Sequence, residues 1–164
     1  MAIGEIDKLK ELGFEGFVTV SQLPSNYNSI PKVKGVYCII CLEDNCKFLE
    51  VGCGGHFKGK NPNVITSLLK TNWVENAGVI YIGKAGGSAS KATLQSRLKQ
   101  YIKFGQGKPV GHWGGRLIWQ IENSRNLIVA WKTLSTEEPR DYEMKLIASF
   151  VVKYGKRPFA NLKD

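Results

Sequence analysis

Residues 35–42 read GVYCIICL, and this run decides the fold class that the sequence predicts. Its Val, Tyr and Ile residues favour an extended strand, and VIYIG at 79–83 is a second run of the same kind. Residues 117–121 and 127–134 also predict strands, with a turn between them at 122–126. The sequence therefore indicates a small sheet of short strands.

Other segments lie between these strands. After a turn signal at 43–45, residues 46–51 could return as a hairpin partner of the first strand. Residues 64–74 carry apolar side chains at helical spacing. Ser90 is expected to be the N-cap of a helix that runs from 91 to about 104. Helices thus alternate with the predicted strands.

A last helix completes the fold class. Ser135 and Glu138 have capping-box spacing, and Gly155 is expected to end the helix that they begin. The order of elements predicts an α+β fold, with a small, mostly antiparallel central sheet of three core strands, a possible extra hairpin strand and flanking helices. The 164 residues contain no internal repeat and no linker, so one domain spanning 1–164 is expected.

The composition is ordinary for a soluble protein, with 43% hydrophobic and 23% charged residues. No run approaches the roughly 18 consecutive apolar residues of a membrane span. Residues 1–12 are charged and mildly helical, without the apolar core and cleavage site of a signal peptide. We therefore expect an intracellular, cytoplasmic protein with no membrane partner.

The positive charge is concentrated in the second half of the chain. The formal net charge is +9; residues 1–83 carry 8 Lys or Arg and 8 Asp or Glu, whereas residues 84–164 carry 15 and 6. A localised basic field is typical of a protein that binds a phosphate backbone. The alternative is a solvated basic surface that maintains solubility.

Four cysteines, Cys38, Cys41, Cys46 and Cys53, raise the question of a structural zinc. Positions 38 and 41 point to opposite faces of the predicted strand, so these two thiols could not easily share a metal ion. A small zinc protein is therefore a weak alternative. A disulfide is possible but has no secretory context to favour it, and reduced thiols are the default expectation.

The last helix contains a conflict in its apolar pattern. Its predicted buried stripe consists of Ile147, Phe150, Val151 and Tyr154, and one turn before Ile147 the same face carries Glu143. A buried carboxylate must neutralise, pair with a cation or bind a metal. Glu143 is therefore either a rim residue paired with a Lys or Arg, or a metal ligand.

Several motifs together resemble those of the GIY-YIG nuclease family. GVY at 35–37 is similar to the GIY element, with Val in place of Ile, and YIG at 81–83 matches the second element. Lys84 follows directly, as it often does in the family. Arg97 lies fourteen residues after the YIG glycine, in the helix where the family carries an essential arginine.

The remaining motifs are in the later part of the chain. Glu143 resembles the metal-binding glutamate of the family, and Asn161, after Pro158, is similar to its closing asparagine. The resemblance covers roughly residues 31–162. The chain departs from the family in the distance between its first two elements, because an insert at about 43–78 separates them.

The resemblance implies a metal-dependent endonuclease that hydrolyses phosphodiester bonds in DNA. It implies a Mg²⁺ (or Mn²⁺) cofactor with Glu143 as the only protein carboxylate, and one carboxylate plus waters is typical of Mg²⁺. The alternative is a non-catalytic nucleic-acid-binding module on the same scaffold. A protein partner for targeting is also possible.

The resemblance also implies a role for each remaining motif residue. Arg97 would contact the phosphate, Tyr81 would orient the water or the phosphate, and Asn161 would hold the metal shell or the phosphate. Tyr37 would be the general base, although its reference pKa of about 10 would have to be lowered by a neighbouring cation such as Lys84. If the family motif is ignored, Tyr37 and Tyr81 are a pair of cross-strand aromatics.

His112 is an additional candidate from outside the motifs. It lies in a glycine-rich segment and titrates near neutrality, so it could be a proton shuttle, a phosphate contact or a surface loop histidine. The expected nucleic-acid contacts are the basic residues of the second half of the chain: Lys84, Arg97, Lys99, Lys103 and Arg116.

Overall fold

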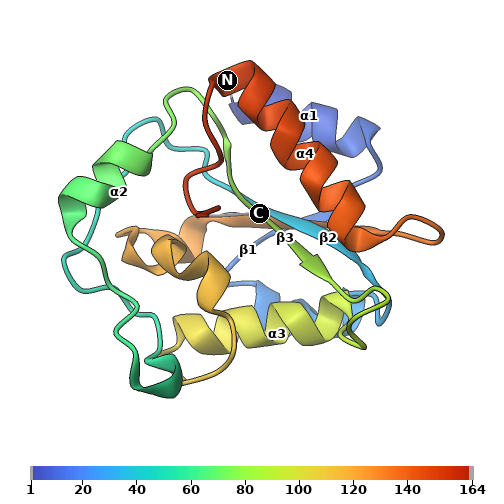
Figure 1. Ribbon diagram of the computed structural model, residues 1–164, viewed down its shortest axis with the longest axis horizontal. Helices are drawn as coiled ribbons and strands as arrows, with labels where there is room; N and C mark the ends of the chain where they lie inside the picture. Colours follow the sequence, from blue (N-terminus) through green and yellow to red (C-terminus); the bar gives the residue numbers. More distant parts are fainter. Residues whose placement is uncertain (1, 163–164) are drawn as a thin grey trace.

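The computed structural model describes residues 2–162, which form an α+β fold around one antiparallel sheet (Figure 1). The four strands lie in the order β1-β4-β2-β3, and every neighbouring pair is antiparallel. Their bounds are Glu15–Thr19 for β1, Gly35–Ile40 for β2, Val79–Ala85 for β3 and Ile128–Thr133 for β4. The predicted class, an α+β fold with an antiparallel sheet and flanking helices, is confirmed.

Helices and 3₁₀ segments cover both faces of the sheet. The α-helices are α1 (Ala2–Glu11), α2 (Thr66–Asn72), α3 (Leu94–Gly105) and α4 (Pro139–Tyr154). The 3₁₀ segments are η1 (Leu23–Ser29), η2 (Phe57–Gly59), η3 (Trp113–Gln120) and η4 (Ser124–Asn126). No helix within residues 2–162 is long and apolar enough to cross a membrane.

Strand alternation divides the core into two clusters. One face of β2 and β3 presents aliphatic and small side chains, including Cys38, Ile40 and Ile82, to α1 and α4. The other face presents Tyr37 and Tyr81 to α3, η1 and η3. Figure 1 shows α1 and α4 on one side of the sheet and α3 on the other. We call these the α4 face and the α3 face.

The predicted hairpin partner at 46–51 is wrong. In this segment only Phe48 makes a bridge, to Ile121, and no ladder forms with β2. The reason is that β3 and β4 already occupy both sides of β2, so β2 has no free edge. The insert instead crosses the end of the sheet and contains η2 and α2.

The predicted strand at 117–121 is also wrong, because these residues belong largely to η3. Both neighbours of β4 are again occupied, by β1 and β2. The strand β1 was missed by the sequence reading. A bulge between Gly16 and Val18, with Phe17 at φ 53°, interrupts the alternation that would have indicated a strand.

The N-cap residues of α3 and α4 differ from the predicted ones. Thr93, not Ser90, caps α3, through a reciprocal capping box with Ser96. Glu138 is the N-cap of α4 and Pro139 its first residue, so Ser135 has no capping role. The predicted stop at Gly155 is confirmed, since this glycine has the left-handed φ of 79°.

Candidate functional site

A polar cavity of about 250 Å³ lies beside β3, one of the two edge strands of the sheet. Because β3 has a neighbour on one side only, side chains from α3 and from α4 can meet around its open edge. Five of the seven predicted catalytic residues line this cavity: Tyr37, Tyr81, Lys84, Arg97 and Glu143. The structure thus brings together residues from β2, β3, α3 and α4.

Sheet register explains why the two tyrosines are neighbours. Tyr37 pairs with Gly83 and Tyr81 pairs with Ile39, so the tyrosines are diagonal neighbours on the α3 face. Their ring centroids are 6.1 Å apart. A side chain on Gly83 would collide with the Tyr37 ring, which lies directly over it. The glycine of the YIG segment is therefore required by the position of Tyr37.

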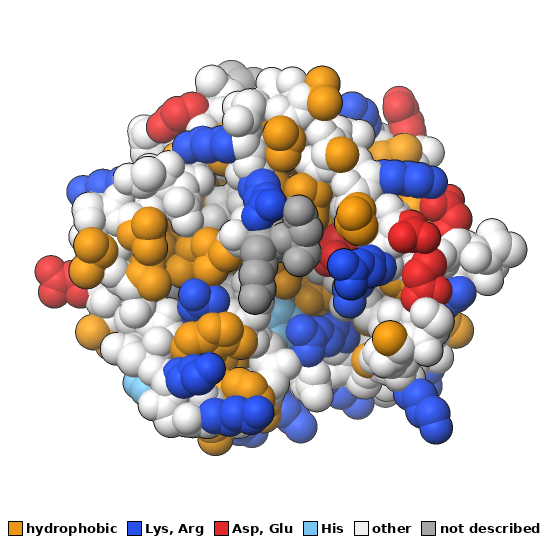
Figure 2. Space-filling view, in the orientation of Figure 1, with side chains coloured by type: hydrophobic (Ala, Val, Ile, Leu, Met, Phe, Trp, Pro, Cys, Tyr) orange, Lys and Arg blue, Asp and Glu red, His pale blue; other side chains and the backbone are white. Residues whose placement is uncertain are grey.

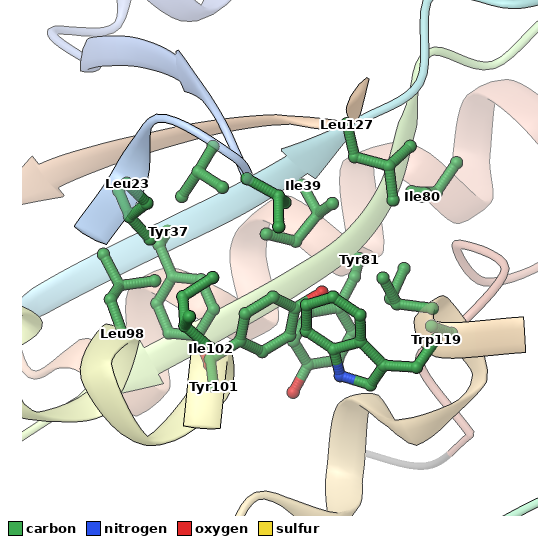
Figure 3. Close-up of a cluster of buried hydrophobic side chains, with 14 of the residues drawn as sticks. Leu23, Tyr37, Ile39, Ile80, Tyr81, Leu98, Tyr101, Ile102, Trp119 and Leu127 are labelled. Carbon is green, nitrogen blue, oxygen red and sulfur yellow. The ribbon is translucent and has the colours of Figure 1, made fainter. Parts of the chain in front are cut away.

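Both tyrosines are buried, as Figure 3 shows for the ring cluster on this face. Burial raises the pKa of Tyr37 well above its ordinary value, and the neighbouring Tyr81 adds to this effect. Burial likewise raises the pKa of Tyr81 to about 12, although the positive charge of Arg97 opposes the rise. The expected lowering of the Tyr37 pKa by a cation is thus outweighed by burial, and both phenols are protonated at neutral pH.

His112 is not a surface loop residue; its side chain is fully buried. Its Nε2 lies 2.7 Å from Oη of Tyr37, and the ring of Tyr101 packs edge-on at 4.6 Å between centroids. Burial, with the positive charge of Arg97, lowers the pKa of His112 well below its ordinary value. The imidazole is therefore neutral, and Nδ1 has no hydrogen-bond partner among the described residues.

Arg97 links the cavity to the segment that carries His112. Its Nη1 donates to the carbonyl of Gly111 at 2.8 Å and to Oε1 of Gln100 at 3.2 Å. Arg97 is half-buried, and its positive charge acts on Tyr37 and on His112. One side chain thereby holds the 111–112 backbone in place and provides a permanent cation at the cavity.

Glu143 occupies the position that its helical spacing predicts. It is half-buried on α4, one turn before the buried Ile147, and it faces the cavity. It shares the cavity lining with Tyr37 and Tyr81, and its negative charge adds to the rise in the pKa of both phenols. The predicted stripe is narrower than expected, because Val151 is 37% exposed.

The donors in the cavity suit a hard cation with few protein ligands. The described residues contain no group of three or more His, Cys, Asp or Glu side chains that could hold a metal ion. Glu143 is the one carboxylate residue among those that line the cavity. Mg²⁺ and Mn²⁺ accept one carboxylate together with water and phosphate oxygens, so this donor set fits either ion.

Asn161 is buried beside β3, and its side chain makes two hydrogen bonds there. Its Oδ1 accepts from the backbone N–H of Ile82 and its Nδ2 donates to the carbonyl of Ile82, both at 2.9 Å. The amide thus replaces the missing neighbour strand at the middle of the YIG segment. Both polar atoms are used on the backbone, so in this structure Asn161 positions β3 instead of facing the metal or phosphate.

The predicted nucleic-acid contacts lie at three places on the molecule. Lys84 is exposed at the cavity, and Arg97 lines it. Lys99 and Lys103 share another flank of α3, and Nζ of Lys99 lies 5.4 Å from the Tyr27 ring centroid. Arg116 packs its guanidinium over the ring of Trp113, at 4.7 Å from the centroid. Figure 2 shows Lys and Arg side chains across this face of the molecule, many of them in the lower half, over α3.

Two residues near the site were not among the predicted site residues. Tyr101 is fully buried against His112 and Tyr81, and its burial is predicted by the apolar spacing of Leu94, Leu98, Tyr101 and Ile102 on α3. Glu138 accepts a hydrogen bond from the backbone N–H of Ser88 at 2.8 Å. This bond ties the loop after β3 to the start of α4, but no local sequence signal indicates it.

The chain was compared with known protein families, with curated proteins and with solved structures, and no match was found. The likeness to GIY-YIG nucleases therefore depends on the sequence motifs. Motif residues as far apart in the sequence as Tyr37 and Glu143 line one cavity.

Proposed function

We propose that this protein is a metal-dependent endonuclease of the GIY-YIG kind that hydrolyses phosphodiester bonds in DNA. The observation that carries the proposal is the polar cavity at the edge of β3, lined by Tyr37, Tyr81, Lys84, Arg97 and Glu143. It combines a carboxylate, two cations and two phenols, and these groups meet the needs of phosphodiester hydrolysis.

The two cations bind and stabilise the phosphate. The Arg97 guanidinium is permanently charged and already fixed by Gly111, so little reorganisation is needed when negative charge develops on the phosphate. Lys84 is exposed at the same cavity and supplies a second positive charge where the DNA backbone would enter. The positive second half of the chain supports a nucleic acid as the polymer.

Tyr37 and His112 are joined by a hydrogen bond. Oη of Tyr37 lies 2.7 Å from Nε2 of His112, whose imidazole stays neutral because burial and the charge of Arg97 lower its pKa. This bond holds the Tyr37 hydroxyl in one orientation, so that its oxygen can accept a hydrogen bond from the attacking water. In this pair Tyr37 contacts the water, whereas His112 is a positioning residue.

Glu143 would hold the Mg²⁺ or Mn²⁺ ion at this cavity. When bound, such an ion supplies positive charge to the phosphate oxygens and to the leaving oxygen. Tyr81 lies beside Tyr37 and orients the phosphate or water through its hydroxyl. Asn161 keeps the backbone of Ile82 in register, so that Tyr81 and Gly83 stay in place below the Tyr37 ring.

The closest alternative is a nucleic-acid-binding module that does not cleave, and the burial of Tyr37 favours it. To test the two functions, the purified chain is incubated with duplex, single-stranded, flap and junction DNA and with the matching RNA forms. Each reaction contains Mg²⁺, Mn²⁺ or a chelator. We expect cleavage of at least one DNA form with metal and none with chelator.

Glu143→Gln and Glu137→Gln make a matched pair on this region of the chain, since Glu137 is exposed and pairs with Lys145 away from the cavity. Cleavage should be lost in the first variant and retained in the second, with DNA binding retained in both. Retained binding without cleavage by the unmodified chain, on every substrate and with either metal, would support the binding module instead. A cytoplasmic location and a targeting partner also remain proposals.

A further inference from the structure

Two cysteines face each other at the start of the insert. Cys41 directly follows β2, Cys46 comes five residues later, and their Sγ atoms are 3.1 Å apart. Both are free thiols in this structure. Since a disulfide bond is about 2.0 Å long, these sulfurs need to approach by only about 1 Å to form one.

The surrounding structure holds the pair together. The backbone N–H of Cys41 donates to the carbonyl of Gly78 at 2.8 Å, which fixes Cys41 at the end of the sheet. Its Sγ also lies 3.6 Å from the carbonyl of Glu43, inside the turn that returns the chain to Cys46. Cys41 is buried and Cys46 is half-buried, so the two thiols differ in their exposure to solvent.

The two thiols also differ in acidity. The hydrogen bond from the Cys46 thiol lowers the pKa of Cys41, although burial and the charges of Glu43 and Asp44 oppose this effect. The same hydrogen bond, together with burial, raises the pKa of Cys46. Cys41 is therefore the more acidic thiol of the pair, and the thiolate is the nucleophilic form of cysteine.

A small reactant has space beside Cys41. A cavity of about 10 Å³ lies there, lined in part by Cys41, Glu43 and Trp73. This volume is at the lower limit for one water molecule, so the approach to the sulfur is narrow. It excludes a bulky disulfide such as oxidised glutathione and favours the smallest thiol oxidants, of which hydrogen peroxide is one.

We propose that Cys41 and Cys46 are a redox-active thiol pair that hydrogen peroxide converts to a disulfide. The Cys41 thiolate attacks one peroxide oxygen, the O–O bond breaks, and the departing hydroxide takes a proton to become water. Cys41 is then a sulfenic acid. The Cys46 sulfur attacks the Cys41 sulfur, the S–O bond breaks, and a second water leaves with the Cys46 proton. The two thiols lose two electrons in total, and the peroxide gains them.

The disulfide would hold the start of the insert at the end of β2. Two residues after Cys46, Phe48 stacks on Phe159 with ring centroids 5.6 Å apart. Phe159 belongs to the C-terminal segment that ends in Asn161 beside β3. Closing the 41–46 loop removes freedom from the unfolded chain, so the oxidised protein should unfold about 2 to 6 °C higher than the reduced protein.

The test is peroxide titration of the reduced, full-length chain, followed by thiol counting in denaturant and by mass spectrometry. We expect the four free thiols to fall to two, with a mass loss of about 2 Da for two hydrogens. Cleavage after Glu43 should give two peptides joined by the 41–46 disulfide. A thermal melt of both forms then measures the shift in the unfolding temperature.

Two single substitutions test the pair, one inside it and one outside it as a control. Cys46→Ser should stop at a Cys41 sulfenic acid, which adds about 16 Da and reacts with a dimedone probe. Cys53→Ser changes an exposed thiol outside the pair and should be oxidised like the unmodified chain. The proposal is overturned if all four thiols persist, if Cys53 forms the bond, or if Cys41 resists oxidation in Cys46→Ser. The proposal does not depend on nuclease activity, because none of these readouts uses DNA.

Discussion

The two faces of the sheet are built from alternate residues of the same strands, yet they differ in chemistry. The α4 face is aliphatic, with side chains such as Val36, Ile40 and Ala130. The α3 face carries rings with polar atoms. Among the described residues, the four buried side-chain polar atoms without a hydrogen-bond partner all lie on the α3 side: Tyr101 Oη, His112 Nδ1, Trp119 Nε1 and Trp131 Nε1.

The two faces therefore contribute differently to the stability of the fold and to the chemistry of the cavity. A buried polar group without a partner destabilises the folded state by roughly 1–3 kcal/mol, so the α3 face is the less favourable one to bury. The α4 face contains no comparable group within the described residues. The aliphatic cluster therefore stabilises the fold, while the aromatic cluster keeps phenols and an imidazole next to the cavity.

The largest expected effect tests the one residue that the α4 side supplies to the cavity. Glu143→Gln should lower the cleavage rate by at least about 10³-fold, or roughly 4 kcal/mol in the activation barrier. The unfolding free energy should change by less than about 1 kcal/mol, because the substitution keeps the shape of the side chain. Plasmid cleavage and urea denaturation measure the two quantities. Full cleavage activity of Glu143→Gln would show that Glu143 is not a catalytic residue.

Ile40→Ala should have the opposite profile. Ile40 is fully buried on the α4 face, so truncation should reduce the unfolding free energy by about 2–4 kcal/mol. The cleavage rate per folded molecule at low temperature should stay within about twofold, since Ile40 is not among the residues that line the cavity. A large loss of activity with unchanged stability would contradict the division between the faces.

Lowering the pH should destabilise the protein because of His112, which is buried on the α3 side of the sheet. The pKa of His112 is depressed in the folded state, so below the unfolded-state pKa of about 6.5 the unfolded chain binds a proton that the folded chain does not. Stability is therefore lost as the pH falls from 7 to 5, by about 1–2 kcal/mol from this residue. Denaturant titrations at several pH values measure it.

Two histidine variants assign this pH dependence. His112→Gln should remove most of the slope between pH 7 and 5, whatever its own effect on stability. His56 is exposed, and His56→Gln should keep the slope. An unchanged slope in His112→Gln would show that His112 does not titrate abnormally in the folded state.

The smallest effect is expected from Tyr101→Phe, which removes a buried hydroxyl that has no partner among the described residues. The unfolding free energy should stay the same or rise by up to about 1 kcal/mol. Tyr37→Phe is the matched variant, because it loses the hydrogen bond to His112 and should lower the cleavage rate. Thermal melts and cleavage assays distinguish them. Clear destabilisation by Tyr101→Phe would mean that its hydroxyl is satisfied by water.

Local patterns predicted several elements correctly. The runs that became β2, β3 and β4 were identified because β-branched and aromatic residues leave a signal within a few positions. The end of α4 at Gly155 has the same kind of local cause. The failures at 46–51 and 117–121 have one common origin. Both segments have strand-like composition, but the sheet offers neither of them a free edge beside β2 or β4.

The candidate site also combines features that local patterns predict with features that depend on the packing of the whole chain. Tyr37, Tyr81, Arg97 and Glu143 could be proposed from motif order and helical spacing, and the cavity contains all four. The burial of His112 could not be proposed, because a glycine-rich segment around a histidine reads as an exposed loop. The hydrogen bonds of Asn161 to Ile82 were also unpredictable, since they join residues 79 positions apart.

Properties that depend on neighbours in the chain could be predicted from the residues alone. These are the main strands, the final helix, the charge difference between the two halves and the residue types available for a phosphodiester-cleaving site. Only the tertiary structure decided that β3 is an edge strand, that Tyr37 contacts His112, and that Cys41 meets Cys46. The physical reason is range: alternation and capping act over a few residues, whereas burial and sheet order result from the packing of the whole chain.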